Sequence, residues 1–286
     1  FSCLKEVKAI CDARGVSVHV CLSIDGFGAV HERVRGVDGC FEKTRAILEE
    51  LYARSPLYCH TFSVGCTISR HNIAFMKETE AFFALFPGLR VEYHLAVPNR
   101  RIHTESDCKS YYVVEDPRAR LLATEFFYEK YRTSADEASR RQNFANYFFL
   151  KSNGRVRPCG CAYLRRDVTL DEGLNMMLCA TRSETIGNLR ETPASGIVRG
   201  RRAKRERRRL KGKMCGTCIH YSYHALSLKG KIAYIVEDMR IGFSLRYYDV
   251  RSRESWRVRS AGTVRLMPQM LRFFSRRFYS IVWKSQ

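Results

Sequence analysis

Three extended stretches alternate with two helical ones in the first hundred residues of this 286-residue chain. The runs at 16–24, 61–68 and 90–97 are rich in β-branched residues, which favour strands. Between them, at 41–53 and 73–85, apolar residues recur at helical spacing. Strands separated by helices predict parallel βαβ units, because a parallel neighbour requires a long crossover.

The carboxyl ends of parallel strands are where such folds place their chemistry. Here the first strand ends at Ser23 and Asp25, and the second ends at Thr67 and Asn72. These hydroxyl, carboxylate and amide groups are candidates for ligand binding. Two structural interpretations stay open: Asp25 precedes Gly26 as a turn residue would, and Asn72 precedes a helix as an N-cap would.

The pattern changes in the second part of the chain. A long helix is expected at 117–141, followed by a hairpin at 147–157 around an Asn-Gly turn. A basic helix is expected at 197–213, and an amphipathic one at 266–283. The stretch from 226 to 265 carries no pattern that we can assign.

Charge separates the same two parts. Residues 1–150 hold 20 Lys and Arg against 19 Asp and Glu, whereas residues 151–286 hold 30 against 10. The basic half predicts an anionic partner: nucleic acid, an acidic peptide or an anionic membrane. No apolar run reaches the length of about 18 residues that spans a bilayer, and no signal peptide pattern is present, so a soluble protein is expected.

Twelve cysteines are distributed unevenly. Those of the first half are scattered singly and predict buried thiols. Those of the second half are clustered, which is typical of metal binding in a reducing, cytoplasmic compartment. An iron–sulfur cluster, a zinc ion (also with His220 or His224) and no metal are all open alternatives. The predicted metal ligands are Cys159, Cys161, Cys179, Cys215 and Cys218.

Several short blocks, in a consistent order, resemble one family. They comprise S-I-D-G with a following His and Arg-Gly, N-G-R-V-R-P-C, I-G-N-L-R-E and C-x2-C. This order resembles that of radical S-adenosylmethionine (radical SAM) enzymes that carry a SPASM-type auxiliary iron–sulfur domain. The blocks are residues 23–26, His31, 35–36, 153–159, 186–191 and 215–218.

The resemblance implies an α/β fold with two parts and an extension. Residues 1–132 would form the C-terminal part of a partial (β/α) barrel of parallel strands. Residues 133–228 would form a small cysteine-bearing α+β auxiliary domain, and residues 229–286 a basic C-terminal extension. The cofactors implied are S-adenosylmethionine and [4Fe–4S] clusters.

The function implied is generation of a 5′-deoxyadenosyl radical that abstracts hydrogen from a peptide or protein substrate. A reductase, flavodoxin or ferredoxin would donate the electron. The family's Cys-x3-Cys-x2-Cys motif is absent from these 286 residues, and Thr192 stands where the auxiliary domain has a cysteine. The chain is therefore expected to be a fragment that is inactive alone, with one auxiliary cluster or none.

The resemblance also assigns roles to the strand ends. Ser23 and Asp25 would hydrogen-bond the ribose or the amino-acid moiety of SAM, and Arg35 would pair with its carboxylate. Thr67 and Asn72 are further candidates of the same kind. A solvated loop arginine is the alternative for Arg35.

The run 199–211 contains nine Lys or Arg in thirteen residues but no aromatic residue. Its composition resembles a nucleic-acid-binding patch, although it lacks aromatic residues that could stack on bases. A charged surface helix, which the family has at this place, and a surface for an acidic substrate peptide are the alternatives. The basic, apolar tail at 266–283 fits either an anionic membrane or packing on the protein itself. Together these features support an alternative function, a basic, zinc-stabilised nucleic-acid-binding protein without catalysis.

Overall fold

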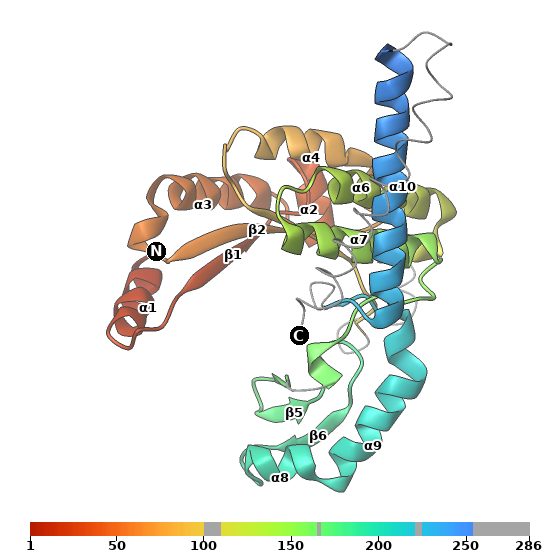
Figure 1. Cartoon of the computed structure of the whole chain (residues 1–286). Coiled ribbons are helices and arrows are strands. Elements are labelled where there is room, and N and C mark those ends of the chain that lie inside the picture. The colour runs from red at the N-terminus through yellow and green to blue at the C-terminus, as the bar shows by residue number, and fades with distance from the viewer. Residues whose placement is uncertain (100–109, 165–166, 221–224, 254–286) are drawn as a thin grey trace. The chain divides into compact units, whose positions relative to one another are not determined.

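The computed structural model describes most of the chain as helices and two small sheets (Figure 1). Its described residues form two compact units, the second of which combines residues 158–160 with residues 225–253. The first unit holds both sheets. The described residues are 1–99, 110–164, 167–220 and 225–253.

The first sheet contains three parallel strands in the order β1-β2-β3. These are β1 (His19–Ser23), β2 (Thr61–Ile68) and β3 (Val91–Leu95). All three lie within the predicted extended runs, so the α/β prediction is confirmed at the level of a mixed fold with a parallel sheet. The described residues show these three parallel strands, and a partial barrel stays a prediction.

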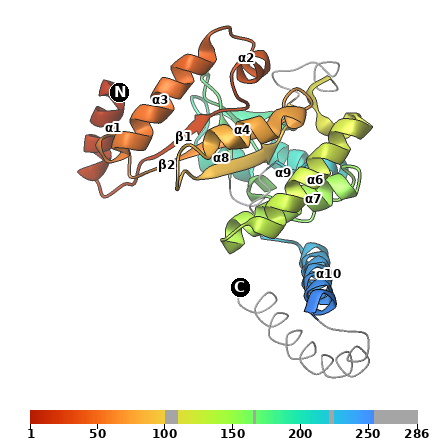
Figure 2. The same ribbon diagram turned by 90° about the horizontal axis from the view of Figure 1, so that it is seen from above.

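Helices connect the strands and cover one face of the sheet. The β1–β2 connection holds α2 (Ala29–Arg35) and α3 (Cys40–Arg54), and the β2–β3 connection holds the short 3-10 helix η2 (Ile73–Phe75) and α4 (Met76–Phe83). Figures 1 and 2 both show α3 and α4 on the same side of β1 and β2. Burial of this apolar face contributes the main hydrophobic stabilisation of the region. Its buried members include Phe41, Leu48, Leu51, Val64, Cys66, Ile68, Phe82 and Phe83.

The N-terminal helix α1 (Ser2–Asp12) precedes the sheet, and two further helices follow it. These are α6 (Pro117–Thr133) and α7 (Glu137–Lys151), each begun by an aspartate that accepts a backbone N–H from its first turn. The single helix predicted at 117–141 is therefore two. The chain leaves the helical conformation at Ser134, where ψ is 125°.

The hairpin predicted at 147–157 is wrong. Tyr147 to Lys151 form the last turn of α7, because Phe144, Tyr147 and Phe149 are buried together with the aromatic residues of α6. The Asn-Gly pair does make a turn, with φ of 55° at Asn153 and 71° at Gly154. Such left-handed residues end helices as readily as they join strands.

The second sheet is antiparallel and has its own small core. It contains β4 (Thr169–Leu170), β5 (Asn175–Met177) and β6 (Thr185–Asn188). Two helices follow, α8 (Ala194–Arg199) and α9 (Arg201–Arg209), and then a π-helical turn at Leu210–Met214 and a 3-10 turn at Cys215–Thr217. The basic helix predicted at 197–213 is thus confirmed in type but is broken at Gly200. The core consists of Met176, Leu178, Ile186, Ile197, Ala203 and Leu210.

The second compact unit consists largely of α10 (Leu228–Arg253), which the sequence did not reveal. In α10 apolar and charged residues are mixed around the helix, so no apolar stripe marks it. Near its start, Ser227 donates its N–H to the carbonyl of Pro158 at 2.8 Å, and a Cβ at Gly230 would lie 2.0 Å from the same oxygen. Among the described residues no helix is long and apolar enough to cross a membrane. The helix predicted at 266–283 lies outside the described residues.

Candidate functional site

Asp25 follows β1 and is buried, with only 3% of its side chain exposed. Its Oδ1 accepts the backbone N–H of Thr67 at 2.7 Å, and its Oδ2 pairs with Nη2 of Arg35 at 2.8 Å. The next residue must be small, because a Cβ at Gly26 would lie 2.6 Å from a methyl group of Val30. The carboxylate therefore joins the end of β1, the end of β2 and helix α2.

Asn72 completes this connection from the other side. Its Nδ2 donates to the carbonyl oxygens of Asp25 and Thr67, both at 2.7 Å. Its Oδ1 accepts the N–H of Ser69 at 2.8 Å. Asn72 is fully buried and occupies the N-cap position of the following 3-10 helix, as one interpretation expected, but its side chain makes no capping hydrogen bond there. We call Asp25, Arg35, Thr67, Ser69 and Asn72 the strand-end network.

His31 is a member of this region that sequence reasoning quoted but gave no role. Its Nδ1 accepts the backbone N–H of Asp25 at 3.1 Å. Burial lowers the pKa of His31, which keeps the ring neutral and able to accept that hydrogen bond. The sequence signal for this role is the position of His31 six residues after Asp25, in the same short block. The hydrogen bond itself depends on how the loop between them closes.

The face of the sheet opposite α3 and α4 is polar. Strand pairing places His19, Cys21 and Ser23 of β1 beside Thr61, Ser63 and Gly65 of β2, and Gly65 and Thr67 beside Glu92 and His94 of β3. Parallel sheets are usually apolar on both faces, so a polar face is a distinctive feature. We call it the polar face.

Parts of the polar face remain open to solvent. His19, Cys21 and Ser23 are exposed, and the ring of His19 lies 2.8 Å from Thr61 Oγ1 and 3.1 Å from Ser63 Oγ. Burial lowers the pKa of His94. The alternation of polar and apolar residues in β2, T-F-S-V-G-C-T-I, was the sequence signal for this face. Of the predicted binding residues, Ser23 and Thr67 lie on it. Asp25, Arg35 and Asn72 belong to the strand-end network, which Thr67 joins through its backbone.

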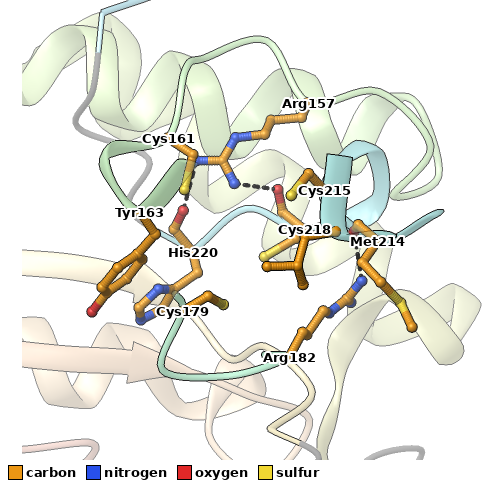
Figure 3. Close-up of a pocket in the computed structure, with 10 residues that line it drawn as sticks. Arg157, Cys161, Tyr163, Cys179, Arg182, Met214, Cys215, Cys218 and His220 are labelled. Carbon is orange, nitrogen blue, oxygen red and sulfur yellow. Dashed lines mark hydrogen bonds between the residues drawn. The ribbon is translucent and has the colours of Figure 1, made fainter. Parts of the chain in front are cut away.

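A second candidate site lies between β5 and the turn that follows α9. Figure 3 shows Cys161, Cys179, Cys215 and Cys218 around one pocket, together with Tyr163 and His220. The rings of Tyr163 and His220 stack with their planes 10° apart and their centroids 5.9 Å apart. We call this the cysteine pocket. It brings together four of the five predicted metal ligands.

Two arginines hold the turn that carries Cys215 and Cys218. Arg157 donates to the carbonyl oxygens of Cys218 at 2.8 Å and His220 at 2.7 Å, and Arg182 donates to that of Met214 at 2.7 Å (Figure 3). The two arginines thus position the thiols indirectly, by holding the backbone carbonyls of the turn.

Burial dominates the acid–base properties of the pocket. It raises the pKa of Cys215 to about 11, with a further increase from the neighbouring thiols. It also raises the pKa of Cys218, against the opposing effect of Arg182 and Arg157. The pKa of His220 falls to about 4 through burial and the charge of Arg157. At neutral pH Cys215 and Cys218 are therefore protonated thiols and His220 is a neutral imidazole.

The side chains of the cysteine pocket are of the kinds that bind metal ions, but their positions are not those of an assembled metal site. Thiolates and a neutral imidazole are ligands for zinc or for an iron–sulfur cluster. Among the described residues, however, no three His, Cys, Asp or Glu side chains are placed to hold one ion. The cavity volume is about 20 Å³, the room of one water molecule. Cys159 is in the second compact unit, where its backbone forms an isolated bridge with Leu226.

Comparison with known proteins gives a limited likeness. No family model matches the chain, and no curated protein matches it. A solved structure of native anSMEcpe with bound AdoMet and Cp18Cys peptide is 13% identical and has a TM-score of 0.46, over 71% of this chain and 54% of that one. A hexahistidine-tagged form of anSMEcpe with bound AdoMet gives 13% identity and a TM-score of 0.47, over 72% and 54%. The chain thus spans about half the length of these proteins.

Proposed function

We propose that this chain is part of a radical SAM enzyme and that the ends of β1 and β2 contribute to its SAM site. The observation that carries the proposal is the strand-end network at the carboxyl edge of a parallel sheet with one polar face. Ligands of parallel α/β folds bind at this edge. The order of the short sequence blocks supports the same family.

In this proposal Arg35 and Ser23 meet the ligand directly. The Arg35 side chain is 39% exposed, and its ion pair with Asp25 occupies one Nη atom, leaving further N–H groups to donate to a carboxylate. The hydroxyl of Ser23 is exposed at the same strand end. Asp25 and Asn72 act differently from the sequence-based expectation, because hydrogen bonds within the chain already occupy their polar atoms. They are positioning residues that fix Arg35 and the strand ends.

When bound, SAM supplies the carbon-centred radical chemistry of the family. These 286 residues contain no Cys-x3-Cys-x2-Cys motif. The proposal for this chain is therefore binding and orientation, with no 5′-deoxyadenosine formed by the chain alone. The exposed thiol of Cys21 on the polar face offers a hydrogen-bonding group to a peptide or protein substrate, and an external reductase, flavodoxin or ferredoxin would supply the electron.

The cysteine pocket is proposed as a metal site that is completed only when its thiols move together. The site could hold either a [4Fe–4S] cluster or a zinc ion. The small volume of the cavity favours the single ion. Cys159 belongs to the second compact unit and stays a predicted ligand. No step of the chemistry is assigned to this site.

Titration calorimetry with SAM tests the proposal. The unmodified chain is expected to bind SAM, and Arg35→Gln is expected to weaken binding about 10-fold, the loss of one charge-assisted hydrogen bond. Arg33→Gln is the matched control, because Arg33 lies on the same helix and makes no contact with Asp25. Absence of SAM binding, or equal effects of the two substitutions, would refute the assignment.

A further inference from the structure

Helix α9 has a composition that its role in the core does not require. Seven of the nine residues in Arg201–Arg209 are Lys or Arg. The two others, Ala203 and Glu206, are buried, as is Leu210 immediately after the helix. Residues three and four apart share a helix face, so these three define the inner face. The basic residues occupy the rest of the circumference of α9, the helix labelled in Figure 1.

Two of the arginines are used within the protein. Arg207 donates to the carbonyl of Val198 at 3.0 Å. Arg209 pairs with Glu206 and also donates to the carbonyl of Arg182 at 2.9 Å. Glu206 accepts the backbone N–H of Glu184 at 2.9 Å as well. The one carboxylate of α9 is therefore committed to the inner side and neutralises none of the outer charges.

Of the remaining exposed cations, five lie opposite the inner face and form one line, with Arg202 to its side. Each of the five is three or four residues from another of them: Arg201, Lys204, Arg205, Arg208 and Lys211. We call these five residues the basic stripe. In the part of the chain that the structure describes, their side chains form no ion pair with a carboxylate. With a rise of 1.5 Å per residue, the stripe is about 15 Å long.

We infer that the basic stripe binds the phosphate backbone of nucleic acid without reading its bases. Guanidinium groups match phosphate oxygens in bidentate geometry, and a line of cations follows a chain of phosphates. No aromatic side chain is present in α9 to stack on a base. Recognition through charge alone is independent of sequence. This binding is separate from the proposed SAM site and does not depend on it.

The same observations count against two other anionic partners. A membrane-surface helix places apolar residues next to its basic ones, but Ala203 and Leu210 are buried with Ile186 and Ile197 in the core. A protein interface has an apolar centre, and the basic stripe has none.

The test is fluorescence anisotropy of labelled oligo(U) and oligo(A) RNA with the full 286-residue chain. The two RNAs should bind with similar affinity. Raising salt from about 50 to about 200 mM should weaken binding about 100-fold, since five phosphate contacts to a single strand give a log–log slope of about −3.5. The variant Arg201→Gln/Lys204→Gln/Arg205→Gln/Arg208→Gln should lose at least about 30-fold in affinity, and its slope should fall to about −1.

A matched variant removes four exposed positive charges elsewhere: Lys43→Gln/Lys77→Gln/Arg118→Gln/Lys229→Gln. It should bind RNA within about 3-fold of the unmodified chain. Circular dichroism checks that both variants fold, and glutamine keeps the helix propensity of the positions in α9. Equal losses in the two variants, or no loss in the stripe variant, would overturn the inference. The inference would also be overturned if the chain bound an oligoglutamate peptide or phosphatidylglycerol vesicles more tightly than RNA, and if the stripe variant lost that binding.

Discussion

The strand-end network and the cysteine pocket lie in the same compact unit but are held in opposite ways. In the network, hydrogen bonds within the chain occupy both carboxylate oxygens of Asp25 and both amide atoms of Asn72. In the pocket, Arg157 and Arg182 bind backbone carbonyls, and the thiols line a small cavity without being assembled into a site.

This difference separates residues that build the fold from residues that are available to a ligand. Removing a member of the network leaves a buried polar group without a partner, which is costly. Removing a thiol from the pocket leaves the arginine–carbonyl bonds in place, so the fold should change little. The predictions below use this contrast, from the largest expected effect to the smallest.

Asp25→Ala should lower the free energy of unfolding by about 3 kcal/mol, because it leaves the N–H of Thr67 and the guanidinium of Arg35 without their buried partner. Urea denaturation followed by circular dichroism measures it. Asp38→Ala, at an exposed aspartate of the same loop region, should change stability by less than about 0.5 kcal/mol. A loss below about 1 kcal/mol for Asp25→Ala would contradict the view that the network holds the strand ends.

Glu206→Ala should cost about 1–3 kcal/mol at pH 7, through loss of the bonds to Arg209 and to the N–H of Glu184. Arg209 lowers the pKa of Glu206 below its ordinary value of 4.5. The unmodified chain therefore has the full stabilisation above pH 4.5 and loses it as the pH falls through the folded-state pKa. Urea denaturation at several pH values should therefore show that the unmodified chain and Glu206→Ala differ less in free energy of unfolding as the pH falls. The control Glu191→Ala, at an exposed glutamate, should differ from the unmodified chain by the same small amount throughout.

Cys215→Ser should change the stability of the chelator-treated chain by less than about 1 kcal/mol. The raised pKa of about 11 makes the thiol of Cys215 slow to react with iodoacetamide. At pH 8 its rate should be about 100-fold below that of exposed Cys21, and it should rise about 10-fold per pH unit up to pH 10. Peptide mass spectrometry resolves the two residues. Equal rates at pH 8 would contradict the raised pKa of the half-buried Cys215.

Metal analysis complements the thiol measurement. After anaerobic purification, iron or zinc bound in the cysteine pocket should be lost in Cys215→Ala and retained in Cys21→Ala, since Cys21 is on the polar face. Absorbance near about 400 nm would identify a cluster, and colourless protein with zinc would identify the single ion. Metal retained in Cys215→Ala would place it outside the pocket.

Sequence patterns predicted the parallel sheet well because its strands are short, β-branched and separated by periodic helices. They failed at Tyr147–Lys151, where helical packing against α6 outweighed the strand propensity of aromatic residues. They also failed at α10, which has no single apolar stripe.

The candidate sites were predictable in part. The positions of Asp25, Thr67 and Asn72 at strand ends could be predicted from the sequence. Their hydrogen bonds, and the ion pair of Asp25 with Arg35 at the end of α2, depend on register and loop closure. The polar face required the pairing of β1 with β2 and of β2 with β3, which places residues 42 and 27 positions apart, such as His19 and Thr61 or Gly65 and Glu92, side by side. Likewise, spacing identified the cysteines but not which four would line one pocket.

Hydrogen–deuterium exchange of the full chain with and without SAM tests the central claim most directly. The account predicts slower exchange at 23–35 and 67–72, the segments joined by the strand-end network, and unchanged exchange at 161–220 around the cysteine pocket. Unchanged exchange at the strand ends under saturating SAM, or protection confined to the cysteine pocket, would contradict it.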